Sequence, residues 1–173
     1  QEMARVRKGE ITFYNLDGDE IEKELKTVEW DAEAAEKAGY EHFMIKEIHE
    51  QPKAVSDTLN SVVKDGAIDL SEVGLSEEEI KEISQIYIVA CGSAYHVGVA
   101  AQYVMEDLAR IPVRVELASE FRYRNPILDP KGLVIIISQS GETADSLAAL
   151  RESKKQGVKT LGIVNVIGSS IAR

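Results

Sequence analysis

Short, largely apolar runs alternate with segments of helical periodicity in the second half of the chain. The runs are Ile86–Ala90, Val113–Leu117, Leu133–Ile137 and Thr160–Val164. Runs of this length are typical of parallel strands that are buried on both faces of a sheet. Between them, apolar residues recur at helical spacing over Ala94–Ala109, with Val97, Ala101, Val104 and Leu108, and over Ala144–Gln156. The alternation predicts an α/β fold with a doubly wound parallel sheet.

The first part of the chain has a different pattern, which predicts a hairpin and a helical leader. Residues 10–15 and 21–28 are β-capable and flank Asp17-Gly18, a dipeptide that favours a hairpin turn. Asp31–Gly39 is small, polar and charged, so we predict a linker or a short exposed helix and a domain boundary there.

Helical periodicity begins at Tyr40, and the apolar positions are Phe43, Met44, Ile48, Val55, Leu59 and Val62. Pro52 predicts a break or kink within this region, and Asp65-Gly66 predicts its end. Ser76 and Glu79 have the spacing of a capping box, which predicts the start of a short helix leading to Ile83.

The net charge of −10 is unevenly distributed along the chain. Residues 1–84 carry 22 acidic and 10 basic side chains, whereas residues 85–173 carry 8 and 10. We interpret the acidic half as a solvated surface. Because nucleic-acid binding needs clustered Lys and Arg, we expect no nucleic acid partner, and the near-neutral half is the better place for a small anion.

Cysteine content and hydropathy bear on the location of the protein. The single cysteine, Cys91, excludes an internal disulfide framework, and the sequence has no apolar run of membrane-spanning length or signal-peptide pattern. We therefore expect a cytoplasmic chain without membrane contact. Parallel sheets of this class usually have more than four strands, and a further helix is predicted from Gly168-Ser169-Ser170-Ile171, so we expect a truncated chain.

Two predicted strand-to-helix turns are rich in small and hydroxyl-bearing residues. Cys91-Gly92-Ser93-Ala94 follows the first strand, and Ser138-Gln139-Ser140-Gly141-Glu142-Thr143 follows the third. In open parallel sheets, ligands bind beyond the carboxyl ends of the strands, where helix N-termini attract anions. Three hydroxyl groups in the second turn exceed what one helix cap requires. We predict that the two turns face a phosphate-bearing ligand, with Gly92 allowing close approach and Ser93 donating to it.

Other chemistry is less well supported by the residues. Neither GxxxxGK[ST] nor GxGxxG occurs at these turns, which argues against nucleotide binding. His42 and His49 lack the spacing of metal ligands, so we expect surface histidines and no metal site. Cys91 has no assignable histidine partner and is interpreted as a small hydrophobic residue. Taken singly, Gly92 or Gly141 is equally well explained by a tight turn.

Three segments resemble the first sugar-isomerase (SIS) domain of the glucosamine-6-phosphate synthase family, the isomerizing glutamine:fructose-6-phosphate aminotransferases. They are ACGSAYH (Ala90–His96), ELASEFRYR (Glu116–Arg124) and SQSGETADSLAAL (Ser138–Leu150). The similarity continues through HEQPKAV (His49–Val55) and NVIGSSIAR (Asn165–Arg173), and residues 1–30 resemble the end of the family's glutaminase domain. The resemblance implies a glutaminase remnant over residues 1–32, a linker and helical leader over residues 33–84, and a flavodoxin-like SIS domain over residues 85–173 that is truncated at its C-terminal end.

The same resemblance implies a reaction and a set of substrate contacts. The full enzyme takes ammonia from glutamine, transfers it to fructose 6-phosphate and forms glucosamine 6-phosphate, with no metal or organic cofactor. The substrate-binding residues would be Cys91, Gly92, Ser93, Ala94, Ser138, Gln139, Ser140 and Thr143. Where the family commonly reads Cys-Gly-Thr-Ser, this chain has Ser93-Ala94, so Ala94 offers only its backbone.

The family's catalytic groups are expected outside these 173 residues. Its glutaminase nucleophile is an N-terminal cysteine, whereas this chain begins with Gln1. Its isomerisation groups, a glutamate, a histidine and a lysine, lie in a second SIS domain and a C-terminal tail that would follow Arg173. We therefore expect a sugar-phosphate-binding part that has no catalytic residues and is inactive alone. The resemblance also implies a homodimer formed through the isomerase domain.

The alternative is a non-catalytic SIS module that senses a phosphosugar for regulation. It predicts an adjoining DNA-binding or other effector domain, and the acidic leader offers no basic recognition helix.

Overall fold

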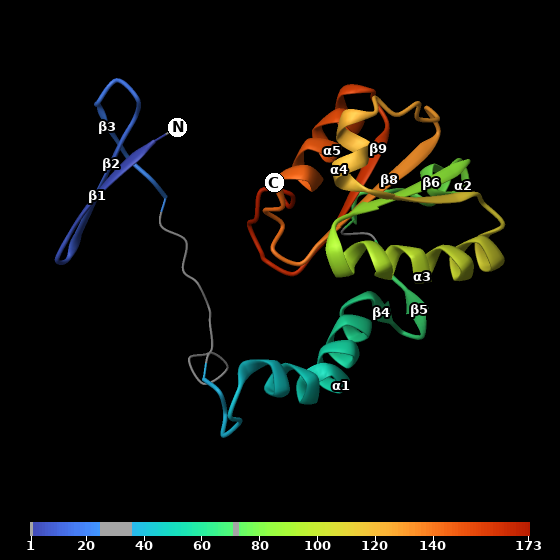
Figure 1. Cartoon of the computed structure of the whole chain (residues 1–173), viewed down its shortest axis with the longest axis horizontal. Coiled ribbons are helices and arrows are strands. Elements are labelled where there is room, and N and C mark those ends of the chain that lie inside the picture. The colour runs from blue at the N-terminus through green and yellow to red at the C-terminus, as the bar shows by residue number, and fades with distance from the viewer. Residues whose placement is uncertain (1, 25–35, 71–72) are drawn as a thin grey trace. The chain divides into compact units, whose positions relative to one another are not determined.

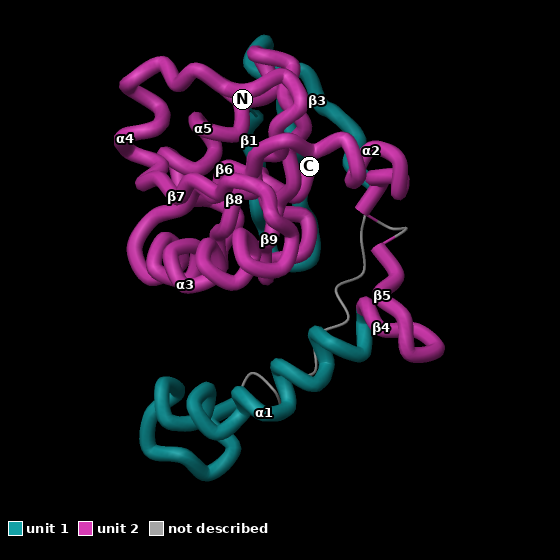
Figure 2. Tube along the Cα trace, turned by 90° about the vertical axis from the view of Figure 1, so that its right-hand side faces the viewer, with its two compact units in different colours: residues 1–61 teal, residues 62–173 magenta. Residues whose placement is uncertain are grey.

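The computed structural model describes residues 2–24, 36–70 and 73–173 (Figure 1). Its contacts divide the chain into two compact units, Gln1–Ser61 and Val62–Arg173 (Figure 2). The predicted boundary between residues 32 and 33 lies outside the described residues, as do residues 31–35 of the predicted linker. The division into three parts therefore stays a prediction.

Unit 1 contains a small antiparallel sheet at the predicted hairpin. Strands β1 (Met3–Arg7), β2 (Glu10–Tyr14) and β3 (Glu20–Ile21) pair in the order β1-β2-β3. In the turn between β2 and β3, Asn15 Oδ1 accepts hydrogen bonds from the backbone N–H groups of Asp17 and Asp19. Gly18 has a φ of 88°, which glycine adopts without strain. The hairpin is confirmed, although residues 25–28 of its predicted second segment lie outside the described residues.

The helical leader is a single helix, α1 (Phe43–Val62), that continues through Pro52. A break at Pro52 is therefore wrong, because the helix continues from Phe43 to Val62, whereas a kink there stays a prediction. Proline fixes φ near a helical value and removes only one backbone donor, so a helix of this length can include it at a local cost. Asp65 and Gly66, with φ of 52° and 77°, form the turn between strands β4 (Val63–Lys64) and β5 (Ala67–Ile68).

Unit 2 carries the predicted parallel sheet, with strand order β7-β6-β8-β9. Its elements follow in the order α2 (Glu77–Lys81), β6 (Gln85–Ala90), α3 (Gly92–Ala109), β7 (Val113–Leu117), α4 (Ala118–Tyr123), β8 (Gly132–Ser138), α5 (Ala144–Lys155) and β9 (Lys159–Val164). The α/β class, the four strands and the two long helices are confirmed. The capping box of α2 is also present, because Ser76 Oγ accepts from Glu79 N and Glu79 Oε2 accepts from Ser76 N.

Helices cover both faces of this sheet, with α3 on one side and α4 and α5 on the other (Figure 1). Successive strand residues point to opposite faces, so each strand contributes to two cores. The α4 and α5 side contains Tyr87, Val89, Ala118, Phe121, Val134, Ile136, Ala149 and Leu150. The α3 side contains Ile86, Ile88, Val113, Leu133 and Ile135, with Ala101 and Met105 packed against them.

The face of α3 that packs on the sheet shares only Ala101 with the apolar stripe that predicted the helix. Val97, Val104 and Leu108 are 59%, 57% and 78% exposed. Gly98 lies against the sheet instead, and an added Cβ would be 2.8 Å from Ile88 Cγ2. Periodicity correctly predicted the helix, because any helical face has the same spacing, but it does not identify the buried face.

Candidate functional site

The two predicted turns begin at the same edge of the sheet. Strands β6 and β8 are neighbours, and Ala90 lies beside Ile137 in their parallel register. The turns Cys91–Ala94 and Ser138–Thr143 therefore start from adjacent strand ends. Ser146 of α5 is fully buried, and its Oγ donates across to Cys91 Sγ at 4.0 Å. The structure thus places the two predicted turns next to each other.

Neither of the helices that follow these two turns has a side-chain cap at its N-terminus. The N-cap of α3 is Cys91 and the N-cap of α5 is Thr143, and neither side chain makes a capping hydrogen bond. The first N–H groups of an α-helix have no partner within the helix. These N–H groups and the helix dipole therefore provide two sets of donors at this edge, from which an anion could accept hydrogen bonds.

Hydroxyl groups in the second turn bind the turn itself. Ser138 is buried, and its Oγ accepts from Gly141 N at 3.1 Å and lies 3.0 Å from Thr143 Oγ1. Ser140 Oγ accepts from Glu142 N at 3.2 Å. An oxygen that accepts from a backbone N–H keeps its own proton for a further bond. Ser140 and Thr143 are half-buried and Gln139 is exposed, so all three border solvent.

Residues of the first turn are also accessible from solvent. Gly92 and Ser93 are exposed, while Cys91 and Ala94 are half-buried. Gly92 has a φ of 58° at the first position of α3, a conformation that strains any residue with a Cβ. This turn geometry by itself explains a glycine here, beside the predicted role of admitting a ligand.

A third segment, which the sequence reasoning missed, holds the second turn from behind. It follows β9, and its backbone N–H groups bind the turn at three points: Asn165 N donates to Gln139 O at 3.2 Å, Ser170 N to Glu142 Oε1 at 2.7 Å and Ile171 N to Gly141 O at 3.1 Å. Hydrogen bonding to Ser170, through its side chain and its backbone N–H, lowers the pKa of the Glu142 carboxyl below its ordinary value. The local pattern Gly168-Ser169-Ser170 instead predicted the start of a helix.

Two ion pairs organise the segment from Glu116 to Arg124. Arg122 Nη1 lies 2.6 Å from Asp145 Oδ1, which belongs to the first turn of α5, and Arg124 binds both carboxylate oxygens of Glu116. The Asp145 carboxylate is thereby neutralised next to the candidate anion site. Ala118 and Phe121 of α4 are fully buried, so one side of this helix packs in the core.

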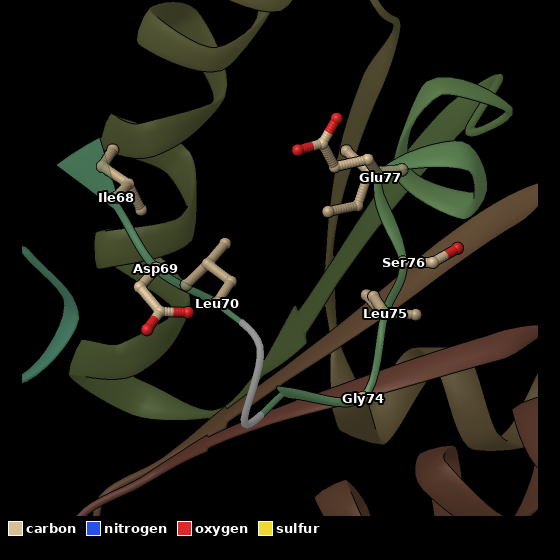
Figure 3. Close-up of a pocket in the computed structure, with 8 residues that line it drawn as sticks. Ile68, Asp69, Leu70, Gly74, Leu75, Ser76 and Glu77 are labelled. Carbon is tan, nitrogen blue, oxygen red and sulfur yellow. The ribbon is translucent and has the colours of Figure 1, made fainter. Parts of the chain in front are cut away.

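The pocket drawn in Figure 3 is lined by other residues: Ile68, Asp69, Leu70, Gly74, Leu75, Ser76, Glu77 and Ile80. Its charged side chains, Asp69 and Glu77, are acidic and do not suit an anion.

Within the described parts of the chain, no group of three or more His, Cys, Asp or Glu is placed to hold a metal ion. His49 stacks on Tyr40 at 5.3 Å, and His42 lies 3.6 Å from Glu41. No helix among the described residues is long and apolar enough to cross a membrane.

Comparison with known proteins identifies relatives along nearly the whole chain. A glutamine–fructose-6-phosphate aminotransferase (isomerizing) of Clostridium acetobutylicum is 57% identical over 164 residues, 94% of this chain and 27% of that protein. The protein of the same name from Caldanaerobacter subterraneus is 54% identical over 173 residues, 99% of this chain and 28% of that protein. The chain thus spans about a quarter of the length of these curated relatives.

Among solved structures, the C-terminal domain of glucosamine-fructose-6-phosphate aminotransferase from Francisella tularensis is similar to this chain. The TM-score is 0.74 at 46% identity, over 80% of this chain and 38% of that one. These relatives confirm the resemblance to the synthase family that the two turns and the Glu116–Arg124 segment first indicated. The family model for the SIS domain matches residues 79–173, more than half of the sequence. This chain therefore belongs to the SIS domain family.

Proposed function

We propose that this chain supplies the fructose 6-phosphate-binding part of the isomerase half of a glutamine–fructose-6-phosphate aminotransferase. The observation that carries the proposal is the meeting of two strand-to-helix turns, without side-chain caps, at one edge of the sheet. Relatives that are 54–57% identical over nearly the whole chain are isomerizing aminotransferases by name, which supports this choice of substrate.

The phosphate is proposed to bind at the start of α5. The free N–H groups of its first turn, the Ser140 hydroxyl and the Thr143 hydroxyl are the donors, with Ser138 and Gln139 completing the turn. The sugar is proposed to lie along Cys91, Gly92, Ser93 and the backbone of Ala94. Pairing of Asp145 with Arg122 supports this arrangement, because it reduces repulsion of the bound phosphate.

Calorimetric titration with fructose 6-phosphate tests the assignment. Ser140→Ala and Thr143→Ala are each expected to weaken binding by about 1–3 kcal/mol, the scale for losing a hydrogen bond to a charged group. Thr58→Ala, in the exposed part of α1, is the control and should bind as the wild type does. Unchanged affinity in both turn variants, or equal affinity for fructose without its phosphate, would refute the assignment.

We propose that the chain alone does not form glucosamine 6-phosphate from glutamine and fructose 6-phosphate. The resemblance assigns the catalytic groups of both half-reactions to parts of the family outside this sequence, and the chain covers about 28% of its relatives. An assay of the purified chain is expected to give no product above background. Product formation that scales with the concentration of the chain would show that it holds a catalytic site.

We also propose a cytoplasmic homodimer, on the strength of the same resemblance and the single cysteine. Light scattering across a range of concentrations measures the mass of the particle directly. A mass of one chain, about 19.1 kDa, at every concentration would exclude the dimer for this part of the protein.

A further inference from the structure

Glu142 is a carboxylate in the middle of the turn where we propose that a phosphate binds. A negative charge so close to an anion opposes binding if the side chain points at the ligand. Its Oε1 instead accepts from the backbone N–H of Ser170, 2.7 Å away and 28 residues later in the chain. The Glu142 carboxylate therefore binds a backbone N–H group of the protein behind the turn.

This contact is one of three that tie the turn to the segment after β9. The other two join backbone groups, from Asn165 N to Gln139 O and from Ile171 N to Gly141 O. Only the contact of Glu142 is made by a side chain, so it is the one that a substitution can remove without changing the backbone. An N–H bond to a carboxylate is also stronger than one to a neutral oxygen.

Packing between the same two segments is close. Ser169 is 3% exposed, and its Oγ would lie 2.1 Å from a Cβ added to Gly141. Because the two segments touch at Gly141, the segment behind the turn supports the shape of the turn. Hydrogen bonds of Ser138 and Ser140 to the N–H groups of Gly141 and Glu142 depend on that shape.

We propose that Glu142 is a positioning residue of the phosphosugar site, and this inference rests on the proposed function of the turn. Its carboxylate holds Ser170 and the segment after β9 against the turn, so that the donors of the turn are ordered before the ligand arrives. Ordering them in advance lowers the entropic cost of binding. Glu142 acts through Ser170 and the backbone, without touching the ligand.

The test compares Glu142→Ala, which removes the acceptor, with Glu142→Gln, which keeps a neutral acceptor oxygen. Hydrogen exchange measured by NMR is expected to show faster exchange at the Ser170 amide, by about tenfold or more in Glu142→Ala and less in Glu142→Gln. Amides in the middle of α3 should keep their wild-type rates in both variants. The control is Glu82→Ala, since Glu82 is exposed and its side chain makes no hydrogen bond or ion pair with other described residues.

Affinity for fructose 6-phosphate separates positioning from simple charge repulsion. The dissociation constant is expected to rise about tenfold in Glu142→Ala, to be largely restored in Glu142→Gln and to stay unchanged in Glu82→Ala. If the wild type binds and Glu142→Ala binds as tightly or more tightly, the inference is overturned while the proposed function stands. If the wild type itself does not bind, the proposed function fails together with the role assigned to Glu142.

Discussion

Gly141 and Ser169 lie so close together that a methyl group on Gly141 would be 2.1 Å from Ser169 Oγ and 2.5 Å from Ser169 Cβ. Gly141 also has a φ of 66°, in the left-handed region that glycine adopts most easily. Ser169 cannot move aside readily, because it is buried between residues whose backbones bind the turn. Two separate constraints therefore favour glycine at position 141: the positive φ of its backbone and the close approach of Ser169.

Gly141→Ala is expected to destabilise the chain by about 2–4 kcal/mol, because left-handed strain and overpacking add. Gly157→Ala is a matched control: its φ is 76°, but an added Cβ would meet nothing within 4 Å. That control should lose only about 1–2 kcal/mol from backbone strain. Urea denaturation of both variants measures the difference, and equal losses would show that the contact with Ser169 is relieved at little cost.

Ser138→Ala is expected to destabilise the chain more than Ser140→Ala does. Ser138 is 4% exposed and accepts from the N–H of Gly141, which would be left buried without a partner at a cost of about 1–3 kcal/mol. Ser140 Oγ accepts from the N–H of Glu142, which is an exposed residue. Without the Ser140 hydroxyl, this N–H can bind water instead. Urea denaturation in the absence of ligand tests the order, and a larger loss for Ser140→Ala would contradict it.

Sequence periodicity was enough to predict the sheet and the placement of the two turns, for a local reason. A strand such as Ile86–Ala90 is buried on both faces, so its apolar character is visible in the residues themselves, and strand ends fix where turns begin. Helix α3 shows the limit, since Val97, Val104 and Leu108 of its predicted stripe are exposed, whereas Ala101 of the stripe and the small Gly98 pack on the sheet. Periodicity therefore predicts that a helix forms, but it does not predict which face of the helix packs on the sheet.

The contact from Glu142 to Ser170 could not be predicted for a related reason. It joins a side chain to a backbone N–H 28 residues away, and a backbone donor leaves no mark in the sequence. Glu142 by itself suggests only helix-dipole stabilisation at the start of α5. The hydroxyl groups were visible as an anion-binding pattern, whereas the segment that supports them becomes evident only from the fold.

Glu79 is expected to make the stability of the chain depend on acid pH. Hydrogen bonds from Lys159 and then from Ser76 lower the pKa of its carboxyl from 4.5 to about 2. Because the folded chain holds this proton less tightly than the unfolded chain, the stabilisation is complete above about pH 4.5 and is lost as the pH falls towards 2. Glu79→Gln should therefore flatten the fall in stability between these pH values. Denaturation of Glu78→Gln at the same pH values is the control, and an equally flat profile there would contradict the assignment to Glu79.

Gly98→Ala sets two opposing effects against each other at the contact of α3 with the sheet. In an exposed helix the change from glycine to alanine gains about 1 kcal/mol. Here the new Cβ would lie 2.8 Å from Ile88 Cγ2 and 3.0 Å from Val115 Cγ1, and both side chains are branched and packed in the core. Overpacking costs about 1–3 kcal/mol, so we expect a net loss of up to about 2 kcal/mol. The reverse change on the exposed side, Ala100→Gly, should lose about 1 kcal/mol from helix propensity alone. A gain in stability for Gly98→Ala in thermal denaturation would mean that α3 moves away from Ile88 more easily than its packing suggests.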